Sequence, residues 1–436
     1  MPHRGLGSIL RAMSALLLGI AILNVGSGAL MAIIGVRLSA QGTSSLVIGA
    51  ITSAYFLGLL FGALFGTKVI DRVGHIRAFV VYAAIGALSI LLLVFADDSL
   101  PAWLVLRMSA GYGMAGLSMI AESWLNHRAT NATRGRVLSV YIIVMNGAFA
   151  VGPLMLNAGD PAGTGLIVVA GILFIAAMLP VALTRTGNPE IGEQTRFGLF
   201  RLFARSPLGV IGALTVGLVE SAVFGMGAVY GNAIGLDTAQ ISIFLSVALG
   251  GVLILQFPLG ALSDKYDREK LILAMAMTCG CAAALLALLE DPPFGLLLML
   301  GFIVGGLASP LYPLCVAEAN DWLEADELVP AGASLVLAYS LGATAGPLAS
   351  SAAMSALGPG GLFVYTAVVL LGLACFATYQ LYERRSRPTA EQTAFQPVSW
   401  VSPVAAHLDP RAPAEPDYDE ETGEYWEDDE SSGISQ

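Results

Sequence analysis

The chain has 436 residues, of which 56% are hydrophobic and only 12% are charged, and its mean hydropathy is +0.75. These values lie outside the range of ordinary soluble domains and indicate an integral membrane protein. Most of the net charge of -11 comes from acidic residues after Tyr382, so the membrane part of the chain is close to neutral.

Twelve apolar runs follow one another along the chain, each long enough to cross a bilayer, which takes about 20 residues. Backbone polar groups find no water in lipid, so runs of this length must form helices. The sequence therefore predicts an all-α integral membrane protein with twelve transmembrane helices as two pseudo-symmetric six-helix bundles. The predicted helices cover residues 8–36, 46–66, 77–96, 101–126, 135–157, 163–183, 207–234, 239–262, 269–289, 293–318, 330–355 and 360–382.

These runs divide the chain into four parts. We expect an N-terminal six-helix bundle at residues 1–183, a cytoplasmic linker at 184–206, a C-terminal six-helix bundle at 207–382 and a tail at 383–436. Phenylalanines and arginines in the linker predict a short helix on the inner membrane surface, with an ordinary solvated linker as the alternative. The tail is rich in proline, acidic residues and serine, so we expect it to be disordered. It is either a solvated extension or a segment that binds partners.

Lysine and arginine set the predicted orientation, because they accumulate on the cytoplasmic side. With the N-terminus inside, every lysine and arginine falls on the inner side except Arg37 and Arg107. Arg37 would face outside, and Arg107 would lie within the membrane. We therefore expect a multi-pass protein with both termini in the cytoplasm.

Two short charged hairpins occupy equivalent places, one after the second predicted helix and one after the eighth. They read GTKVIDRVGHIR at residues 66–77 and GALSDKYDREK at residues 260–270. Each contains an acid followed directly by a base. The Gly-Pro-Leu that begins at Gly152 likewise returns at Gly346, at almost the same offset. The chain therefore consists of two copies of one half.

The hairpins resemble the loop signature of the major facilitator superfamily, which is roughly G-x-x-x-D-R/K-x-G-R/K-x-R/K. The first copy keeps the signature residues Asp71, Arg72, Gly74 and Arg77. The second keeps Gly260, Asp264, Lys265, Arg268 and Lys270, and has Asp267 in place of the inner glycine. The strings AESWLNHR, RGRVLSVY and LYPLCVAEA resemble the YcaD-like branch of bacterial transporters in this superfamily. The resemblance implies a transporter of the bacterial inner membrane and assigns the hairpins to its inner gate.

Charges at membrane depth cost several kcal/mol unless they are paired or hydrated, so they are candidates for function. Arg107 lies about two turns into the fourth predicted helix, in the string RMSAGYG, which contains Tyr112. This string is similar to the superfamily's R-x-x-x-G-x-G motif, whose arginine is implicated in proton coupling. Glu122 follows on the same face of that helix but about 22 Å away along its axis, so the two cannot pair directly.

Glu122 and Glu318 lie at equivalent positions near the inner ends of the fourth and tenth predicted helices. One interpretation is that both carry protons. The other, favoured by the family resemblance, is a latch that holds the inner gate shut. In that latch Glu122 pairs with Arg72 or Arg77, and Glu318 pairs with Arg268 or Lys265. Asp71 would then face the positive N-terminus of the eleventh helix.

Glu220 lies near the middle of the seventh predicted helix, and Asn24 holds the equivalent place in the first. Transporter sites lie near the midplane between the repeats, so we predict that Glu220 titrates protons or binds substrate. The alternative is a neutral glutamic acid hydrogen-bonded within the helix packing. Other polar side chains predicted to line the cavity, about half of which we expect to be packing residues, are Tyr55, Tyr112, Asn146, Tyr230, Asn232, Gln256, Tyr312 and Tyr339.

The predicted function is secondary active transport of a small organic solute, coupled to protons and operating by alternating access. The Gly-Pro strings at Gly152 and Gly346 are similar to the antiporter motif of the superfamily, which favours antiport or efflux. The alternatives are a proton symporter for uptake and a transport-dead sensor that signals through its acidic tail. No phosphate-binding G-x-x-x-x-G-K-S/T loop is present, so ATP-driven transport by this chain is not expected.

The expected partners are a small-molecule substrate, protons and the lipid bilayer, without nucleic acid, and the expected state is a monomer. We expect no cofactor, no metal and no enzymatic activity. The four cysteines fall in apolar runs without the spacing of a metal site, and the four histidines fall in loops and chain ends.

Overall fold

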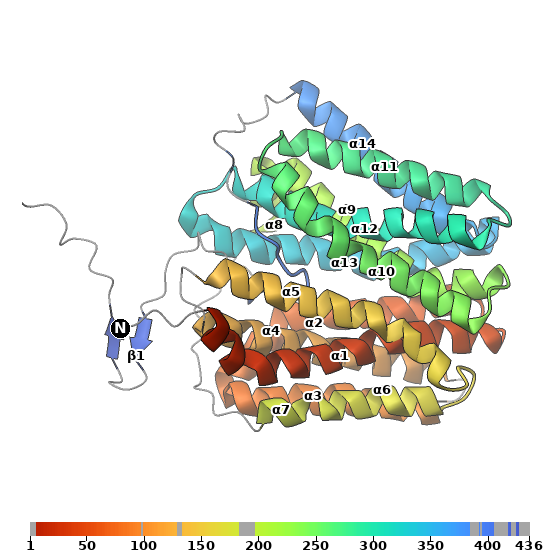
Figure 1. The fold of residues 1–436 in the computed structure, drawn as a ribbon, viewed down its shortest axis with the longest axis horizontal. Helices are drawn as coiled ribbons and strands as arrows, with labels where there is room; N and C mark the ends of the chain where they lie inside the picture. Colours follow the sequence, from red (N-terminus) through yellow and green to blue (C-terminus); the bar gives the residue numbers. More distant parts are fainter. Residues whose placement is uncertain are drawn as a thin grey trace, which may run out of the picture.

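The computed structural model describes residues 6–96, 99–128, 133–182, 197–383, 392, 395–404, 417–419 and 424–426. Nearly all of them are helical (Figure 1). The helices are α1 (Leu6–Ala40), α2 (Ser45–Val73), α3 (His75–Leu92), α4 (Leu100–Arg128), α5 (Arg134–Val151), α6 (Gly165–Ala176), α7 (Met178–Ala182), α8 (Leu199–Arg205), α9 (Pro207–Ala233), α10 (Thr238–Ser263), α11 (Arg268–Leu288), α12 (Phe294–Asn320), α13 (Leu328–Leu357) and α14 (Gly361–Glu383). Short 3₁₀ turns are η1 (Leu93–Phe95), η2 (Gly152–Ala158) and η3 (Ala325–Glu327), and the tail carries an antiparallel pair, β1 (Asp417–Asp419) and β2 (Glu424–Trp426).

The all-α membrane fold predicted from the apolar runs is confirmed. Eleven helices in the described part of the chain are long and apolar enough to span a membrane. The sixth predicted span is shorter, covering Gly165–Val181, and is divided into α6 and α7. Pro180 explains the division, because proline has no N–H to bond the carbonyl of Ala176 four residues earlier and its ring crowds that carbonyl.

The two charged hairpins turn in different ways, which explains why the second departs from the family signature. Gly74 separates α2 from α3 with φ at 80°, a conformation that favours glycine. At the matching place Asp267 has φ at -57° and needs no glycine. Its carboxylate instead accepts hydrogen bonds from the backbone N–H groups of Glu269 and Lys270 and caps α11.

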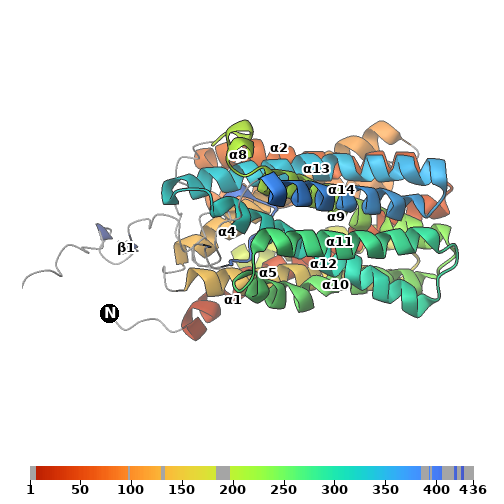
Figure 2. The ribbon, with the colours of Figure 1, turned by 90° about the horizontal axis from the view of Figure 1, so that it is seen from above.

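The internal duplication of the sequence is repeated in the helix packing. Helix α1 packs on α5, α2 on α4 and α3 on α6 in the first half; α9 packs on α13, α10 on α12 and α11 on α14 in the second. In Figure 1 the first half forms the lower group of helices and the second half forms the upper group, and Figure 2 shows both from above. Between the halves, α2 contacts α13, α5 contacts α10 and α1 contacts α9.

Glycines allow the closest of these helix contacts. A Cβ atom on Gly58 of α2 would lie 1.9 Å from the carbonyl oxygen of Met108, and one on Gly111 of α4 would lie 2.0 Å from the carbonyl oxygen of Tyr55. Small residues at such positions let two backbones approach each other in a membrane protein.

We expect Gly58→Ala to destabilise the folded protein by about 1–3 kcal/mol, the usual cost of overpacking. Gly372→Ala in α14 is the matched control, because no atom lies within 4 Å of the added methyl group. Thermal unfolding of the purified variants in detergent measures the difference. Equal melting temperatures for the two variants would contradict the close α2–α4 contact.

The two ends of the molecule differ in how the halves meet. At the end that carries the α1–α2 turn, here called the turn end, the halves touch directly. The Asn232 side chain donates a hydrogen bond to Ser39 Oγ at 3.0 Å, and Asn157 donates one to Ser242 Oγ at 2.7 Å. Deeper along α2, Ser53 Oγ accepts from the backbone N–H of Leu348 at 3.2 Å.

The opposite end carries α8 and the end of α14, and is here called the linker end. Residues 395–404 of the tail lie between the two halves there (Figure 1). These residues depart from the expectation of a disordered tail: Ser399, Val401, Ser402 and Val404 are buried. The remainder of the tail lies outside the described residues, apart from Gln392, β1 and β2. Helix α8 is present in the linker as predicted, and its Phe200 is 92% exposed.

Candidate functional site

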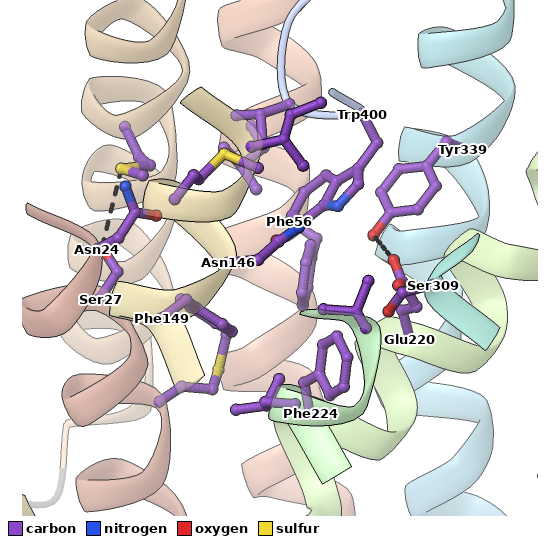
Figure 3. A pocket seen from close by; sticks show the side chains of 18 of the residues that line it. Asn24, Ser27, Phe56, Asn146, Phe149, Glu220, Phe224, Ser309, Tyr339 and Trp400 are labelled. Carbon is purple, nitrogen blue, oxygen red and sulfur yellow. Dashed lines mark hydrogen bonds between the residues drawn. The ribbon is translucent and has the colours of Figure 1, made fainter. Parts of the chain in front are cut away.

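A cavity of about 70 Å³ lies between the two halves. Most of its wall is apolar, with Phe56 of α2, Phe149 of α5 and Phe224 of α9 among the lining residues, together with several methionines. A few polar side chains interrupt this wall (Figure 3). They are Asn24, Ser27, Tyr55, Asn146, Glu220, Gln256, Ser309 and Tyr339, to which the tail adds Trp400.

Among the residues that the structure describes, Glu220 is the one acid that lines this cavity, and it is 2% exposed. Its Oε2 atom accepts a hydrogen bond from the hydroxyl of Tyr339 on α13 at 2.7 Å. The hydroxyl of Ser309 on α12 lies beside the same carboxylate (Figure 3). Three helices of the second half thus converge on Glu220, and Figure 3 shows these three side chains together on one wall.

The predicted site residues Asn24 and Gln256 also reach the cavity. Asn24 lies on the wall opposite Glu220 (Figure 3), and its amide donates to the carbonyl of Ile20 in the preceding turn of α1 at 2.8 Å. Gln256 enters from α10 and is 4% exposed. The structure thus brings three of the predicted site residues, one from each of α1, α9 and α10, to the same space.

Arg107 was predicted in the site, but it lies one layer behind the cavity wall. Its guanidinium stacks on the ring of Tyr55 at 4.5 Å from the centroid, and Nη2 contacts the sulfur of Met31 at 3.8 Å. Tyr55 and Met31 both line the cavity, so they lie between Arg107 and the cavity. Tyr112, also predicted in the site, is not among the residues that line this cavity; its ring lies beside Tyr82 of α3, with the centroids 5.5 Å apart.

The predicted gate residues lie at the linker end, in two environments. Asp71, Arg72 and Arg77 of the first hairpin are exposed, as are Asp264 and Lys265 of the second. The acids predicted to latch against them are buried instead: Glu122 accepts a hydrogen bond from Tyr141 at 2.9 Å, and Glu318 accepts from Ser206 and from the indole of Trp322.

We expected Glu318 to pair with Arg268 or Lys265, but Arg268 pairs with Asp321 instead. Arg268 is 1% exposed, and its Nη1 atom donates to Asp321 Oδ2 at 2.5 Å and to the carbonyl of Ala317 at 3.0 Å. Asp321 lies three residues beyond Glu318, almost one turn further along the chain. Asp321, and not Glu318, is therefore level with Arg268 at the start of α11.

Two residues that line the cavity, Ser309 and Trp400, were not predicted from the sequence. Ser309 was not considered, since a single serine within an apolar helix has no distinguishing pattern. Trp400 was assigned to the disordered tail. The available signal was the string FQPVSWVSPV at residues 395–404, which is far more apolar than the acidic sequence that follows it.

Metal binding finds no support in the described part of the chain, where no three histidine, cysteine or acidic side chains are grouped to hold an ion. Cys279 and Cys315 are buried free thiols, and Cys281 and Cys375 are exposed ones.

Comparison with known proteins places this fold and site in a family. The chain is 28% identical over 367 residues to an MFS-type transporter of Enterobacter sp. (strain 638), covering 82% of this chain and 93% of that one. It is 27% identical over 366 residues to the MFS-type transporter YcaD of Shigella flexneri serotype 5b, with the same coverage. The predicted resemblance to YcaD-like transporters is therefore confirmed, and neither name states a substrate.

Solved structures agree in fold. The nucleoside transporter NupG superposes with a TM-score of 0.72 at 15% identity, covering 86% of this chain and 100% of that one. A D-xylose-proton symporter superposes with a TM-score of 0.69 at 13% identity, covering 87% and 99%. The family model of the Major Facilitator Superfamily matches residues 16–289 and 209–412, and with the duplicated helix packing around a central cavity this establishes that the chain belongs to that superfamily.

Proposed function

We propose that this transporter couples the movement of a small organic solute to protons, with Glu220 as the group that carries the proton. The observation behind the proposal is the place of Glu220 in the wall of the central cavity, where it is the one acid among the described residues. We further propose that the linker end faces the cytoplasm of a bacterial inner membrane, with both termini inside. The two halves would move so that the cavity opens first to one side of the membrane and then to the other. The protein would do this as a monomer.

The environment of Glu220 supports both charge states. Burial among apolar side chains makes the ionised carboxylate costly and favours the neutral acid. The hydroxyl of Tyr339 donates a hydrogen bond to the carboxyl group and that of Ser309 lies beside it, so hydroxyl groups are in place to stabilise the anion once the proton has left. A cationic or donor group of a solute that enters the cavity replaces the proton, so proton and solute exclude each other at one site. That competition favours antiport over symport.

The cavity wall defines the class of solute. Phenylalanine, methionine and aliphatic side chains form most of it, and the amides of Asn24, Asn146 and Gln256 are among its neutral hydrogen-bonding groups. A site of this composition suits an amphipathic solute that has an apolar body and one cationic or donor group.

A thermal-shift screen of the purified protein against metabolites and drugs identifies the solute. Its flux is then measured in proteoliposomes with and without an imposed pH gradient. We expect the pH gradient to drive accumulation of the solute on one side, and an uncoupler to abolish it. A stabilising ligand whose flux ignores the pH gradient would contradict proton coupling, and the direction of accumulation relative to the proton gradient decides between antiport and symport.

Direct contact of the halves at the turn end predicts that a covalent bond there stops transport. Ser39→Cys with Asn232→Cys replaces two side chains whose polar atoms lie 3.0 Å apart. In a background with the four native cysteines changed to serine, we expect oxidation to abolish flux and reduction to restore it. Either single variant, treated in the same way, is the control. Undiminished flux in fully crosslinked protein would argue against alternating access.

A further inference from the structure

We propose that residues 395–404 of the tail, here called the tail plug, are an intramolecular inhibitor that occupies the transport cavity from the linker end. This inference rests on the proposed transport function, because it describes how the same cavity is regulated. The tail plug blocks entry of solute and wedges the two halves apart at that end.

The tail plug is anchored at its outer end by one of the predicted gate residues. The backbone N–H of Phe395 donates a hydrogen bond to Asp264 Oδ1 at 2.7 Å. The ring of Phe395 fills the space over Gly260 of α10, where a Cβ atom would lie 2.3 Å from the ring. On the opposite half, Gly135 of α5 accommodates Gln396, whose Oε1 would lie 3.0 Å from an added Cβ. The plug therefore contacts both halves where it enters.

The middle of the tail plug is buried against the first half. Ser399 is 1% exposed and lies next to the hydroxyl of Tyr141, which donates a hydrogen bond to Glu122. Ser399 and Ser402 also line a smaller space with Tyr312 of α12. The hydroxyls of both serines accept hydrogen bonds within the plug, Ser399 from the backbone N–H of Val401 at 3.3 Å and Ser402 from that of Val404 at 3.1 Å. A buried polar group without a partner costs about 1–3 kcal/mol, so these bonds allow the serines to be buried in the seated position.

The side chain of Trp400 is the part of the tail plug that reaches the proposed proton site. The indole of Trp400 stacks on the ring of Tyr339 with the centroids 4.6 Å apart and the planes 26° from parallel. Tyr339 is the residue that donates to Glu220. Phe56 and Leu59 of α2 complete the enclosure of Trp400 from the other half. In Figure 3 the indole enters between the wall that bears Asn146 and the wall that bears Tyr339.

The remaining space shows why a seated plug excludes solute. The cavity that remains around the seated plug is small, at about 70 Å³, and Val398, Trp400 and Val401 of the plug form part of its wall. The plug belongs to the same chain, so its effective concentration at the cavity is set by the linkage and does not depend on the amount of protein. Modest contacts are then enough to keep it seated, and a solute has to displace it.

A reporter cysteine in the cavity tests the plug without any knowledge of the solute. Asn146→Cys is introduced into the full chain with the four native cysteines changed to serine, and its modification by N-ethylmaleimide is timed. We expect Trp400→Ala to raise the rate about tenfold, as loss of a stacked and buried aromatic side chain predicts. Trp426→Ala, which removes the same kind of side chain from β2, should leave the rate unchanged.

A second pair of variants displaces the plug without altering the tail. Gly260→Ala places a methyl group against Phe395, and we expect the same acceleration of labelling. Gly250→Ala on the same helix meets no atom within 4 Å and should have no effect. Equal labelling rates for the unchanged tail, Trp400→Ala and Gly260→Ala would overturn the proposal.

The labelling experiment and the flux experiment can fail independently. Labelling uses no solute and no proton gradient, so a fast rate in the unchanged protein would disprove the plug while transport stands. Conversely, protected labelling with no proton-driven flux of any ligand would leave the plug intact and refute the transport proposal.

Discussion

Glu220→Gln is expected to abolish accumulation of solute driven by a pH gradient, down to the level of protein-free liposomes. Glutamine keeps the shape of the neutral acid and can still accept a hydrogen bond from Tyr339, but it cannot release a proton. Transport that needs no proton, such as exchange of solute for solute, should persist. The measurement is flux in proteoliposomes with and without the imposed gradient.

Glu318→Gln is the matched control, because Glu318 is also a buried acid of the second half but lies at the linker end, with Ser206 and Trp322 as its partners. If the Glu220 variant still accumulates solute against its gradient, Glu220 has a structural role and coupling has to be sought at Glu122 or Glu318. Equal melting temperatures of the unchanged protein and Glu220→Gln would show that loss of flux is not loss of folding.

Arg268→Ala is expected to cost about 3–5 kcal/mol of folding stability, the usual effect of removing one partner of a buried ion pair. Arg268 is 1% exposed, and its removal leaves Asp321, which is 5% exposed, without its charged partner at 2.5 Å. The carbonyl of Ala317 and the hydroxyl of Ser263 lose a donor as well. Thermal and chemical unfolding in detergent measures the loss.

The adjacent exposed pair provides the control for Arg268. Lys270 lies 3.4 Å from Asp267, but its side chain is 70% exposed, so Lys270→Ala should change stability by no more than about 1 kcal/mol. The double variant Arg268→Ala with Asp321→Ala should recover part of the loss, because no charge is then buried alone. A cost for Arg268→Ala as small as that for Lys270→Ala would mean that the pair contributes little to stability.

The amino-acid sequence alone determined the class of fold and its repetition. Long apolar runs permit only helices in lipid, because every backbone polar group has to be satisfied within the segment. The two charged hairpins fall at matching places, and their glycine and aspartate positions follow from local backbone geometry, as Gly74 and Asp267 show. Glu220 was accessible to prediction because an acid in the middle of such a helix is rare and costly.

Only the tertiary structure decided which polar side chains face the cavity. In a soluble helix the apolar stripe marks the buried face, but lipid is as apolar as the interior of the protein, so a membrane helix is apolar all round. The sequence therefore could not separate Tyr339, which bonds to Glu220, from Tyr112, which packs on Tyr82. Register along neighbouring helices likewise decided that Arg268 pairs with Asp321.

The tail shows the same division most clearly. Its overall composition favours disorder, because few apolar side chains are available to offset the entropy of ordering the chain. Residues 395–404 nevertheless lie buried, since the cavity between the two bundles supplies the partners that the tail itself lacks. Tyr339 stacks on Trp400, Asp264 accepts from Phe395, and Gly260 leaves space for its ring. These partners come from helices far away in the sequence, so no property of the tail taken alone could reveal them.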